Sequence, residues 1–191
     1  MTDSIGILAL QGDFAKHQAS LEKIGVPTLR VKTAAELKNC RGLIIPGGES
    51  TTITKLIKKT GLHRPLLEFA AANPVFGTCA GAIMMANEVD DTRVKSLQLM
   101  DISIQRNAYG RQLDSFITEL PADFLSQPAR FRSVFIRAPR ITRTGPAVKI
   151  LMEYDGHPIM VQQGHFLATS FHPELTDDSR IHAYFVSLIR S

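Results

Sequence analysis

The chain has few cysteines: Cys40 and Cys79 are the two among its 191 residues. One disulfide could join them, but nothing else suggests secretion, because the first residues lack a basic segment followed by an apolar stretch. No window of the sequence approaches the apolar length that a membrane span requires. We therefore expect a cytoplasmic protein with both thiols free.

Acidic residues are fewer than basic ones, 18 against 22, which gives a net charge of +4 and a pI of about 9.2. A basic pI can indicate nucleic-acid binding. Neither an aromatic stacking motif nor zinc-ligand spacing accompanies the densest arginines, which are Arg130, Arg132, Arg137, Arg140 and Arg143. A solvated face or an interface with an acidic partner is favoured. The histidines also lack metal-ligand spacing, so we expect no metal and no cofactor.

Internal repeats and low-complexity linkers are absent from the sequence. Hydrophobic residues make up 44% of it and charged residues 21%, the balance of an ordinary globular protein. A chain of this length can bury a sizeable core without disulfides or metal. We predict a single domain over residues 1–191.

Apolar runs and helical periods alternate in the first half of the chain. Runs typical of buried parallel strands occur at 5–10, 28–31, 42–45 and 74–76. Helices are expected through Phe14, His17, Leu21 and Ile24 up to Gly25, and over 51–59, 65–72 and 82–89. This alternation predicts an α/β fold with a mostly parallel sheet, whose binding sites lie at the carboxyl ends of the strands.

The second half of the chain differs, because strand-like runs joined by short turns dominate it. They lie at 99–105, 113–120, 131–136, 148–153, 159–163 and 166–170, and Asp155-Gly156 is a hairpin signal. A final helix is predicted after Thr176 as N-cap, with Asp177 and Asp178 in its first turn. Its core-facing side chains would be Ile181, Phe185 and Leu188.

The sharpest local signal is the pentapeptide GTCAG at residues 77–81. A predicted strand ends before it and a helix begins after Cys79, with small residues that permit the tight turn of a nucleophile elbow. The helix N-terminus would favour the thiolate, and the Ala80 amide would point towards an oxyanion. On this motif alone, a buried structural cysteine is an equally good interpretation. Cys40 lacks such a context and is expected to be structural.

A second signal is His172-Pro173-Glu174, which follows the last predicted strand. Residues two apart in an extended segment point the same way, and Pro173 favours an extended His172. Glu174 could therefore orient the imidazole while His172 takes a proton from Cys79. Alone, the motif is weak, because a surface loop with an incidental His and Glu would look the same. Together with an upstream elbow cysteine it indicates a catalytic triad.

The turn PGGES at residues 46–50 ends a predicted parallel strand, where ligands bind in such sheets. Its glycines allow an unusual backbone, and an amide of Gly48 could complete an oxyanion hole. The alternative is an ordinary turn before a helix capped by Ser50 or Thr51. A phosphate-binding loop is not indicated, because no Gly-Lys-Ser/Thr follows.

Together these motifs resemble those of the triad-type (class I) glutamine amidotransferases. The chain is similar to one branch in particular, the glutaminase subunits of pyridoxal 5'-phosphate synthase. The resembling stretches are LQG (10–12), LIIPGGESTT (43–52), FGTCAG (76–81), RNAYGRQ (106–112), VFIRAP (134–139) and SFHPELTDD (170–178). The stretches 106–112 and 135–139 distinguish the branch.

The resemblance implies a three-layer fold with a mostly parallel central sheet, flanking helices and additional antiparallel strands in the second half. It implies a Cys79-His172-Glu174 triad, and Gly48 and Ala80 as oxyanion donors. Contacts with L-glutamine would come from Gly48, Glu49, Ser50, Arg106, Ile136 and Arg137. The implied partner is a (β/α)8-barrel synthase subunit in a large hetero-oligomer, which receives ammonia and builds pyridoxal 5'-phosphate.

Four other functions remain open from the sequence. The chain could be the glutaminase of another amidotransferase, such as an imidazole glycerol phosphate synthase, or a related cysteine hydrolase such as a peptidase. It could also be a non-catalytic binding subunit, which measured glutamine turnover would exclude. A nucleic-acid-binding module would instead reveal itself by salt-dependent DNA binding.

Overall fold

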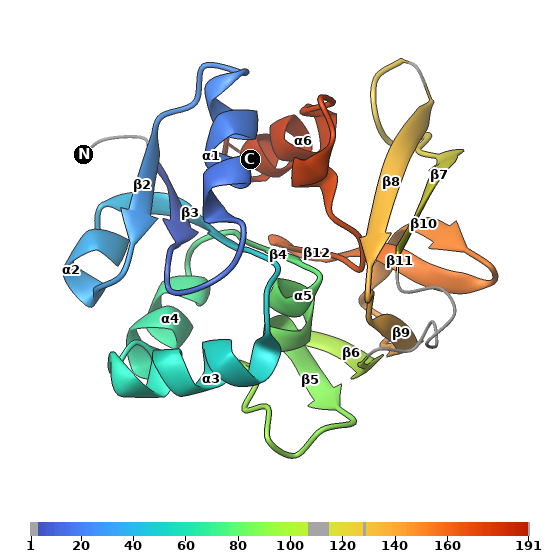
Figure 1. Ribbon diagram of the computed structural model, residues 1–191. Coiled ribbons are helices and arrows are strands. Elements are labelled where there is room, and N and C mark those ends of the chain that lie inside the picture. The colour runs from blue at the N-terminus through green and yellow to red at the C-terminus, as the bar shows by residue number, and fades with distance from the viewer. Residues whose placement is uncertain (1–3, 107–114, 128, 191) are drawn as a thin grey trace.

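A seven-stranded sheet forms the centre of the computed structural model, which describes residues 4–106, 115–127 and 129–190 (Figure 1). Five neighbouring strands are parallel: β12 (Phe166–Thr169), β4 (Val75–Thr78), β3 (Cys40–Ile45), β1 (Ser4–Leu8) and β2 (Thr28–Val31). At the β12 edge, β11 (His157–Gln163) and β10 (Lys149–Tyr154) add antiparallel strands. The predicted mostly parallel sheet is confirmed.

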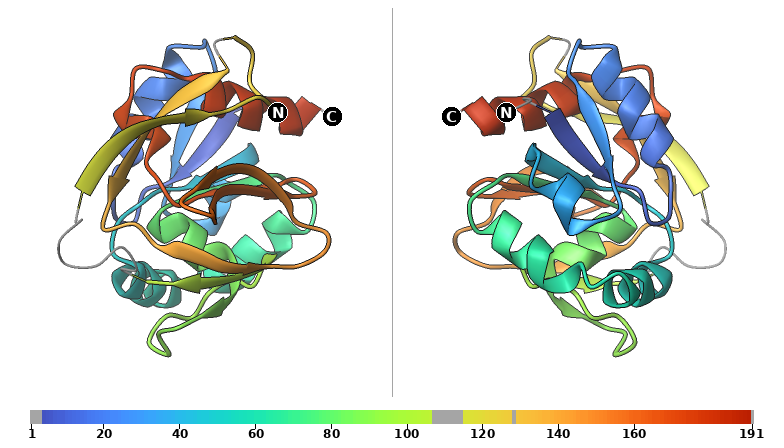
Figure 2. Two further views of the ribbon diagram at one scale, coloured as in Figure 1. Left: turned by 90° about the vertical axis from the view of Figure 1, so that its right-hand side faces the viewer. Right: turned by 90° about the vertical axis from the view of Figure 1, so that its left-hand side faces the viewer.

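Helices cover both faces of this sheet (Figures 1 and 2). On one face lie α1 (Phe14–Glu22) and α6 (Arg180–Arg190); on the other lie α2 (Ala34–Leu37), α3 (Ser50–Lys59), α4 (His63–Ala70) and α5 (Ala80–Met85). Two hydrophobic clusters result, because successive strand residues point to opposite faces. In β3, for example, Leu43 and Ile45 join one cluster and Ile44 joins the other. The three-layer α/β fold is confirmed.

Two smaller sheets extend the molecule beyond the central one. One contains β5 (Ala86–Val89), β6 (Met100–Gln105) and β9 (Arg140–Thr144), and the other pairs β7 (Ser115–Pro121) with β8 (Arg130–Ile136). Phe131 and Phe135 of β8 lie near the Phe171 ring, with centroid separations of 6.0 and 5.7 Å. These contacts attach β8 to the segment that follows β12.

The predicted β-hairpin at Asp155-Gly156 is confirmed. Tyr154 of β10 pairs with His157 of β11, and the two residues between them have φ values of 50° and 72°. Positive φ at both central positions is the geometry of a type I′ turn, whose twist matches that of the flanking strands.

Other boundaries predicted from the sequence were wrong. The helix expected over 82–89 ends at Met85, and β5 follows because Ala86 is extended and pairs with Met100. The strand β9 was missed. Thr176 does not cap the last helix: it ends a 3-10 turn, η1 (Pro173–Leu175), and α6 begins at Arg180. The first helix, expected up to Gly25, ends at Glu22, and Ile24 beyond its end is 36% exposed.

Part of the sequence prediction falls outside the described residues. This applies to residues 107–112 of the stretch 106–112 and to the first two residues of the strand expected over 113–120. The described part of that strand begins at Ser115.

Candidate active site

Cys79 lies at the sharp turn between β4 and α5, at the carboxyl end of the parallel sheet. Its backbone has φ 49° and ψ −106°, a sparsely populated conformation for a residue with a side chain. Small neighbours make the turn feasible: a Cβ on Gly81 would lie 1.9 Å from the Ile45 carbonyl oxygen, and one on Gly77 would lie 2.6 Å from Gly81. The predicted nucleophile elbow is confirmed as a structural feature.

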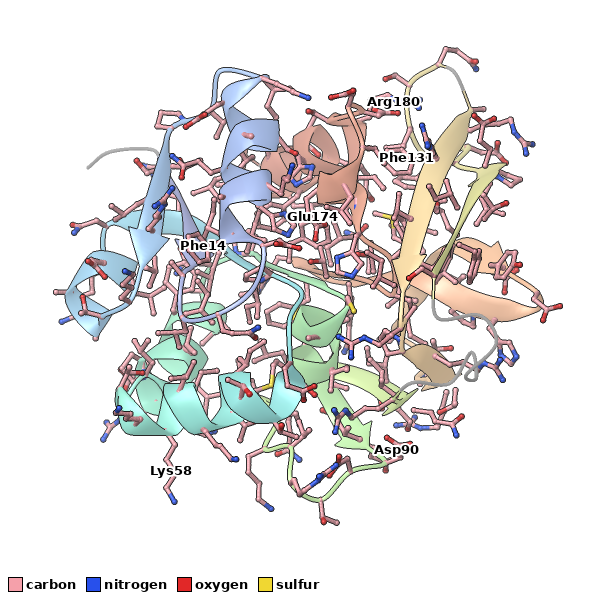
Figure 3. All side chains as sticks on the ribbon, viewed as in Figure 1. Phe14, Lys58, Asp90, Phe131, Glu174 and Arg180 are labelled. Atoms are coloured by element: carbon pink, nitrogen blue, oxygen red, sulfur yellow. The ribbon has the colours of Figure 1, made fainter. Side chains whose placement is uncertain are left out.

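His172 and Glu174 are buried beside this turn. His172 Nδ1 lies 2.7 Å from Glu174 Oε1, and the His172 amide donates to the Val134 carbonyl of β8 at 2.8 Å. The two side chains therefore meet as predicted, although the expected extended backbone was wrong. Glu174 reaches the imidazole from the 3-10 turn η1 instead. Figure 3 shows Glu174 deep among packed side chains, between α1 and α6 on one side and the sheet on the other.

The electrostatics of the three side chains favour a charged pair. Burial lowers the pKa of His172, but hydrogen bonds with Cys79 and Glu174 outweigh it and raise the pKa to about 10. Burial raises the pKa of Glu174, and the nearby His17 and His172 more than offset this, so the pKa is lowered overall. An ionised Glu174 can thus hold a protonated His172 next to the sulfur.

The turn after β3 lies against the same side chains. The Gly47 amide donates to Thr78 Oγ1 at 3.1 Å, and the Glu49 amide donates to Gln11 Oε1 at 2.8 Å. A Cβ on Gly47 would lie 2.5 Å from His172 Cε1, so this glycine is required by close approach rather than by a special φ. The Glu49 carboxylate caps α3 by accepting from the Thr51 amide.

A cavity of about 250 Å³ opens at this point of the molecule. Nine predicted site residues line it: Gly48, Glu49, Ser50, Cys79, Ala80, Arg106, Ile136, Arg137 and His172. Glu174 lies behind His172 rather than in the wall. The volume is below the ~300–1,000 Å³ usual for drug-sized ligands, which favours a small substrate.

The family model for the SNO glutamine amidotransferases matches residues 7–191. The chain belongs to the SNO glutamine amidotransferase family.

Relatives of this glutamine amidotransferase span nearly its whole length. The pyridoxal 5'-phosphate synthase subunit PdxT of Solibacter usitatus is 48% identical over 187 residues, which cover 96% of this chain and 97% of that protein. The subunit of the same name from Niallia circulans is 49% identical, with 97% of each chain covered. A crystal structure described as a glutamine amidotransferase is 40% identical, with a TM-score of 0.92 over 98% of this chain and 99% of the other. The resemblance seen in the sequence is confirmed.

Charged side chains of both signs meet at the mouth of the amidotransferase cavity. Arg106 Nη2 lies 3.0 Å from Glu49 Oε1, and Arg106 Nη1 also pairs with Asp91. Burial raises the pKa of Glu49, but hydrogen bonds from Thr51 and the charges of Arg106 and Arg137 lower it overall. A wall with ionised carboxylate and guanidinium groups suits a zwitterionic ligand such as an amino acid.

Three cavity residues were missed in the sequence: Gln11, Asp13 and Ile83. Gln11 and Asp13 follow β1 at the carboxyl edge of the sheet, the position that could have signalled them. Gln11 is partly buried, and its side-chain oxygen accepts from the Glu49 amide.

Cys40 is unsuited to nucleophilic chemistry. Both cysteines are free thiols, as predicted. Cys40 lines a larger cavity of about 460 Å³ between α2 and α4, away from His172. Burial and the nearby Glu36 raise the pKa of its thiol to about 11, so it stays protonated near neutral pH. The larger cavity therefore lacks the reactive groups that the smaller one brings together.

Within the described residues, no cluster of three or more His, Cys, Asp or Glu side chains could hold a metal ion. None of the helices in that part of the chain is both long and apolar enough to cross a membrane.

Proposed function

We propose that this glutamine amidotransferase hydrolyses L-glutamine to L-glutamate and ammonia, with Cys79 as nucleophile, His172 as acid and base, and Glu174 as the group that orients His172. One observation carries the proposal: the elbow cysteine and His172 line one small cavity at the carboxyl edge of the sheet, and Glu174 contacts His172 from behind it. Nucleophile, base and orienting carboxylate are the parts that acyl transfer through a thiol requires.

The reaction follows from these positions. The Cys79 sulfur attacks the side-chain amide carbon of glutamine, and the amide oxygen gains negative charge. Backbone amides of Gly48 and Ala80, at the cavity wall, would stabilise this oxyanion. His172 gives its proton to the departing nitrogen, which leaves as ammonia and a thioester remains. Water then attacks the thioester, His172 takes a proton from it, and glutamate and the free thiol are released.

Substrate recognition would use the charged mouth of the cavity. Glu49 is placed to attract the α-ammonium group of glutamine, and Arg106 and Arg137 its α-carboxylate. Ser50 and the backbone of Gly48 and Ile136 would add polar contacts. Because Arg106 already pairs with Asp91 and Glu49, we expect it to fix Glu49 as well as to attract the carboxylate.

We infer that the ammonia is passed to a partner synthase that makes pyridoxal 5'-phosphate (vitamin B6). The relatives named above carry the name of a subunit of that synthase. The partner would be a (β/α)8-barrel subunit in a large hetero-oligomer, located in the cytoplasm. Residues 1–191 would form a single glutaminase domain within it. The alternative, a glutaminase of another amidotransferase such as imidazole glycerol phosphate synthase, has no comparable support.

Glutamine turnover, with ammonia as readout and the barrel subunit present, tests the proposal. The Cys79→Ala variant should lose turnover and covalent labelling by a glutamine-like electrophile while keeping its fold, because the attacking sulfur is gone. Cys40→Ala is the matched control and should retain full activity. Turnover that persists in Cys79→Ala would exclude the proposed mechanism.

A further inference from the structure

Two buried histidines lie directly behind the proposed triad. His17 of α1 and His182 of α6 are both 0% exposed. His17 Nε2 lies 3.1 Å from Thr78 Oγ1 and 3.5 Å from Glu174 Oε2, and His17 Nδ1 lies 3.0 Å from His182 Nε2. The sequence indicated His17 only as one of the residues at helical spacing in the first helix. The fold instead places it against the far side of Glu174.

The proton positions on the His17 and His182 rings follow from the groups that surround them. Glu174 Oε2 and His182 Nδ1 have no hydrogen-bond partner among the described residues. If His17 carried its proton on Nδ1, its Nε2 lone pair would face the Glu174 carboxylate, and His182 would bury an N–H with no acceptor. A lone pair that faces a carboxylate and a buried N–H without an acceptor are both energetically costly, so this tautomer is disfavoured. The favoured state has His182 Nε2–H donating to His17 Nδ1, and His17 Nε2–H directed at Thr78 and Glu174.

Burial keeps both rings neutral. It lowers the pKa of His17 and lowers that of His182 to about 3. A neutral imidazole is therefore a fixed dipole here, with its N–H end towards the carboxylate. Thr78 Oγ1 also accepts the Gly47 amide, so the same hydrogen-bond network reaches the turn that holds the Gly48 oxyanion donor.

We propose that His17 is a positioning residue for the triad, which directs its Nε2–H at the second carboxylate oxygen of Glu174 and links it through Thr78 to the Gly47 turn. His182 fixes the tautomer of His17 that this requires. The inference rests on the proposed Cys79-His172-Glu174 mechanism. It assigns no contact with glutamine to either histidine.

Loss of the His17 N–H should impair catalysis rather than binding. The His17 N–H is hydrogen-bonded to Thr78 and lies 3.5 Å from Glu174 Oε2, which has no hydrogen-bond partner of its own in the described part of the chain. Removing this dipole from beside a buried charge should cost about 10- to 100-fold, so kcat should fall by about that factor while KM stays nearly constant. The acid limb of the kcat/KM profile should also move to higher pH, because Glu174 would protonate more easily. The charged or titratable groups around His17 are Glu174, His172, His182 and Asp13.

The test compares His17→Phe with His17→Gln in the assembled complex with its barrel synthase. Phe removes the N–H and keeps most of the volume; Gln can return an N–H near the Nε2 position. We expect the loss in kcat and the pH shift in His17→Phe, and rescue to within about threefold in His17→Gln. The matched control is His165→Leu: His165 contacts the Ala70 carbonyl before β12, at the opposite end of that strand from the site, and should be silent.

Wild-type kcat and pH dependence in His17→Phe would overturn the proposal, as would equal losses in both variants without a pH shift. If His17→Phe does not fold, His182→Leu provides the test instead. It should lower kcat and move the acid limb of the kcat/KM profile to higher pH, and unchanged kinetics would overturn the proposal. Cys79→Ala, measured in parallel, distinguishes a failure of the proposed mechanism from a failure of the proposed role of His17. An active Cys79→Ala contradicts the mechanism, whereas an inactive one alongside unaffected histidine variants contradicts only the role of His17.

Discussion

At the scale of single residues, the strained backbone of Cys79 is the feature that gives the site its geometry. A φ of 49° at a non-glycine residue costs roughly 1–3 kcal/mol. The tight packing of Gly77 and Gly81 against Met85 and Ile45 holds the turn in place. The strained turn places Cys79 in the wall of the cavity that His172 also lines.

His172 and Glu174 should contribute unequally to turnover. Replacing His172 with Ala removes the proposed proton donor and acceptor and should lower kcat by several orders of magnitude. Glu174→Gln should cost less, because His172 remains in place but loses a charged partner 2.7 Å away. Steady-state kinetics at a saturating concentration of the partner subunit would measure both. Intact activity in Glu174→Gln would mean that Glu174 is only a neighbour.

The pairing of Arg106 illustrates what single residues in a sequence do not reveal. The family resemblance implied a contact with glutamine, and a guanidinium at this position suited either the substrate α-carboxylate or a structural ion pair. The structure adds two carboxylate partners, Asp91 and Glu49, from two other segments. Neither partner could be assigned from the sequence, because ion pairs of this kind depend on how separate loops approach one another.

At the scale of elements, two turns from different parts of the sheet edge interlock. The turn after β1 packs on the turn after β3 so closely that a Cβ on Gly12 would lie 1.7 Å from the Gly47 carbonyl oxygen. Gln11 from the first turn accepts the amide of Glu49 in the second. Movement of one turn must therefore affect the other.

Gly47→Ala should damage catalysis through His172. The new Cβ would meet His172 Cε1 at 2.5 Å, and displacement of a catalytic group by about 1 Å can cost about 100-fold in rate. We expect kcat to fall by at least about that factor. Gly164→Ala is the control: it has φ 56° and open space around its Cβ, so it should cost roughly 1–2 kcal/mol of stability and leave kcat unchanged. Equal kcat in Gly47→Ala and wild type would contradict this reasoning.

At the scale of the whole molecule, the buried histidines make the fold sensitive to acid. The pKa of His182 is lowered from 6.5 to about 3, so between these values the unfolded chain binds more protons than the folded one. Stability should therefore decrease as pH falls through this window. His172 affects stability at alkaline pH. Because folding raises its pKa from 6.5 to about 10, protonated His172 stabilises the folded state fully below pH 6.5, and this stabilisation is lost as the pH rises through about 10.

Urea unfolding at a series of pH values would measure this dependence. In wild type, the free energy of unfolding should begin to fall below about pH 6.5, before most carboxylates titrate. His182→Leu should show a shallower fall, because one buried neutral imidazole is gone. His157→Gln, at the start of β11, should match the wild-type slope. A wild-type free energy that stays constant from about pH 6.5 to 5 would contradict the prediction.

The isolated chain should be a poor glutaminase that its partner activates. Hydrogen bonds anchor the amides of Gly47 and Glu49, and the Gly47–Gly48 peptide between them is the unit we expect to reorient. Losing one oxyanion donor costs about 100- to 1,000-fold in rate. A partner that docks on α1 and the 11–12 turn could select the competent state, because that turn contacts the 47–48 turn.

Titration with the partner synthase subunit would measure this activation. Glutamine turnover should rise by about the factor of one oxyanion donor and then saturate. Gln11→Ala should weaken the response, because it removes the acceptor of the Glu49 amide. A rate that is already maximal without partner, and flat across the titration, would exclude activation by the partner.

The sequence by itself determined the features that depend on contiguous residues. The elbow around Cys79, the hairpin at Asp155-Gly156 and the proximity of His172 to Glu174 follow from local glycines, turn chemistry and short spacing. Alternating apolar runs and helical periods likewise predicted the mostly parallel sheet. Short-range sterics and side-chain periodicity determine these features, and both are visible in the order of residues.

The tertiary structure alone decided which distant residues surround the proposed triad. Gln11 and His17 follow β1, whereas His182 lies on α6, and the sheet order with its covering helices brings them to Glu174 and the Gly47 turn. The same holds for β5, where pairing with β6 overrode a helical pattern. Such contacts join segments up to 165 residues apart. Their formation depends on the packing of the entire chain, which no local pattern encodes.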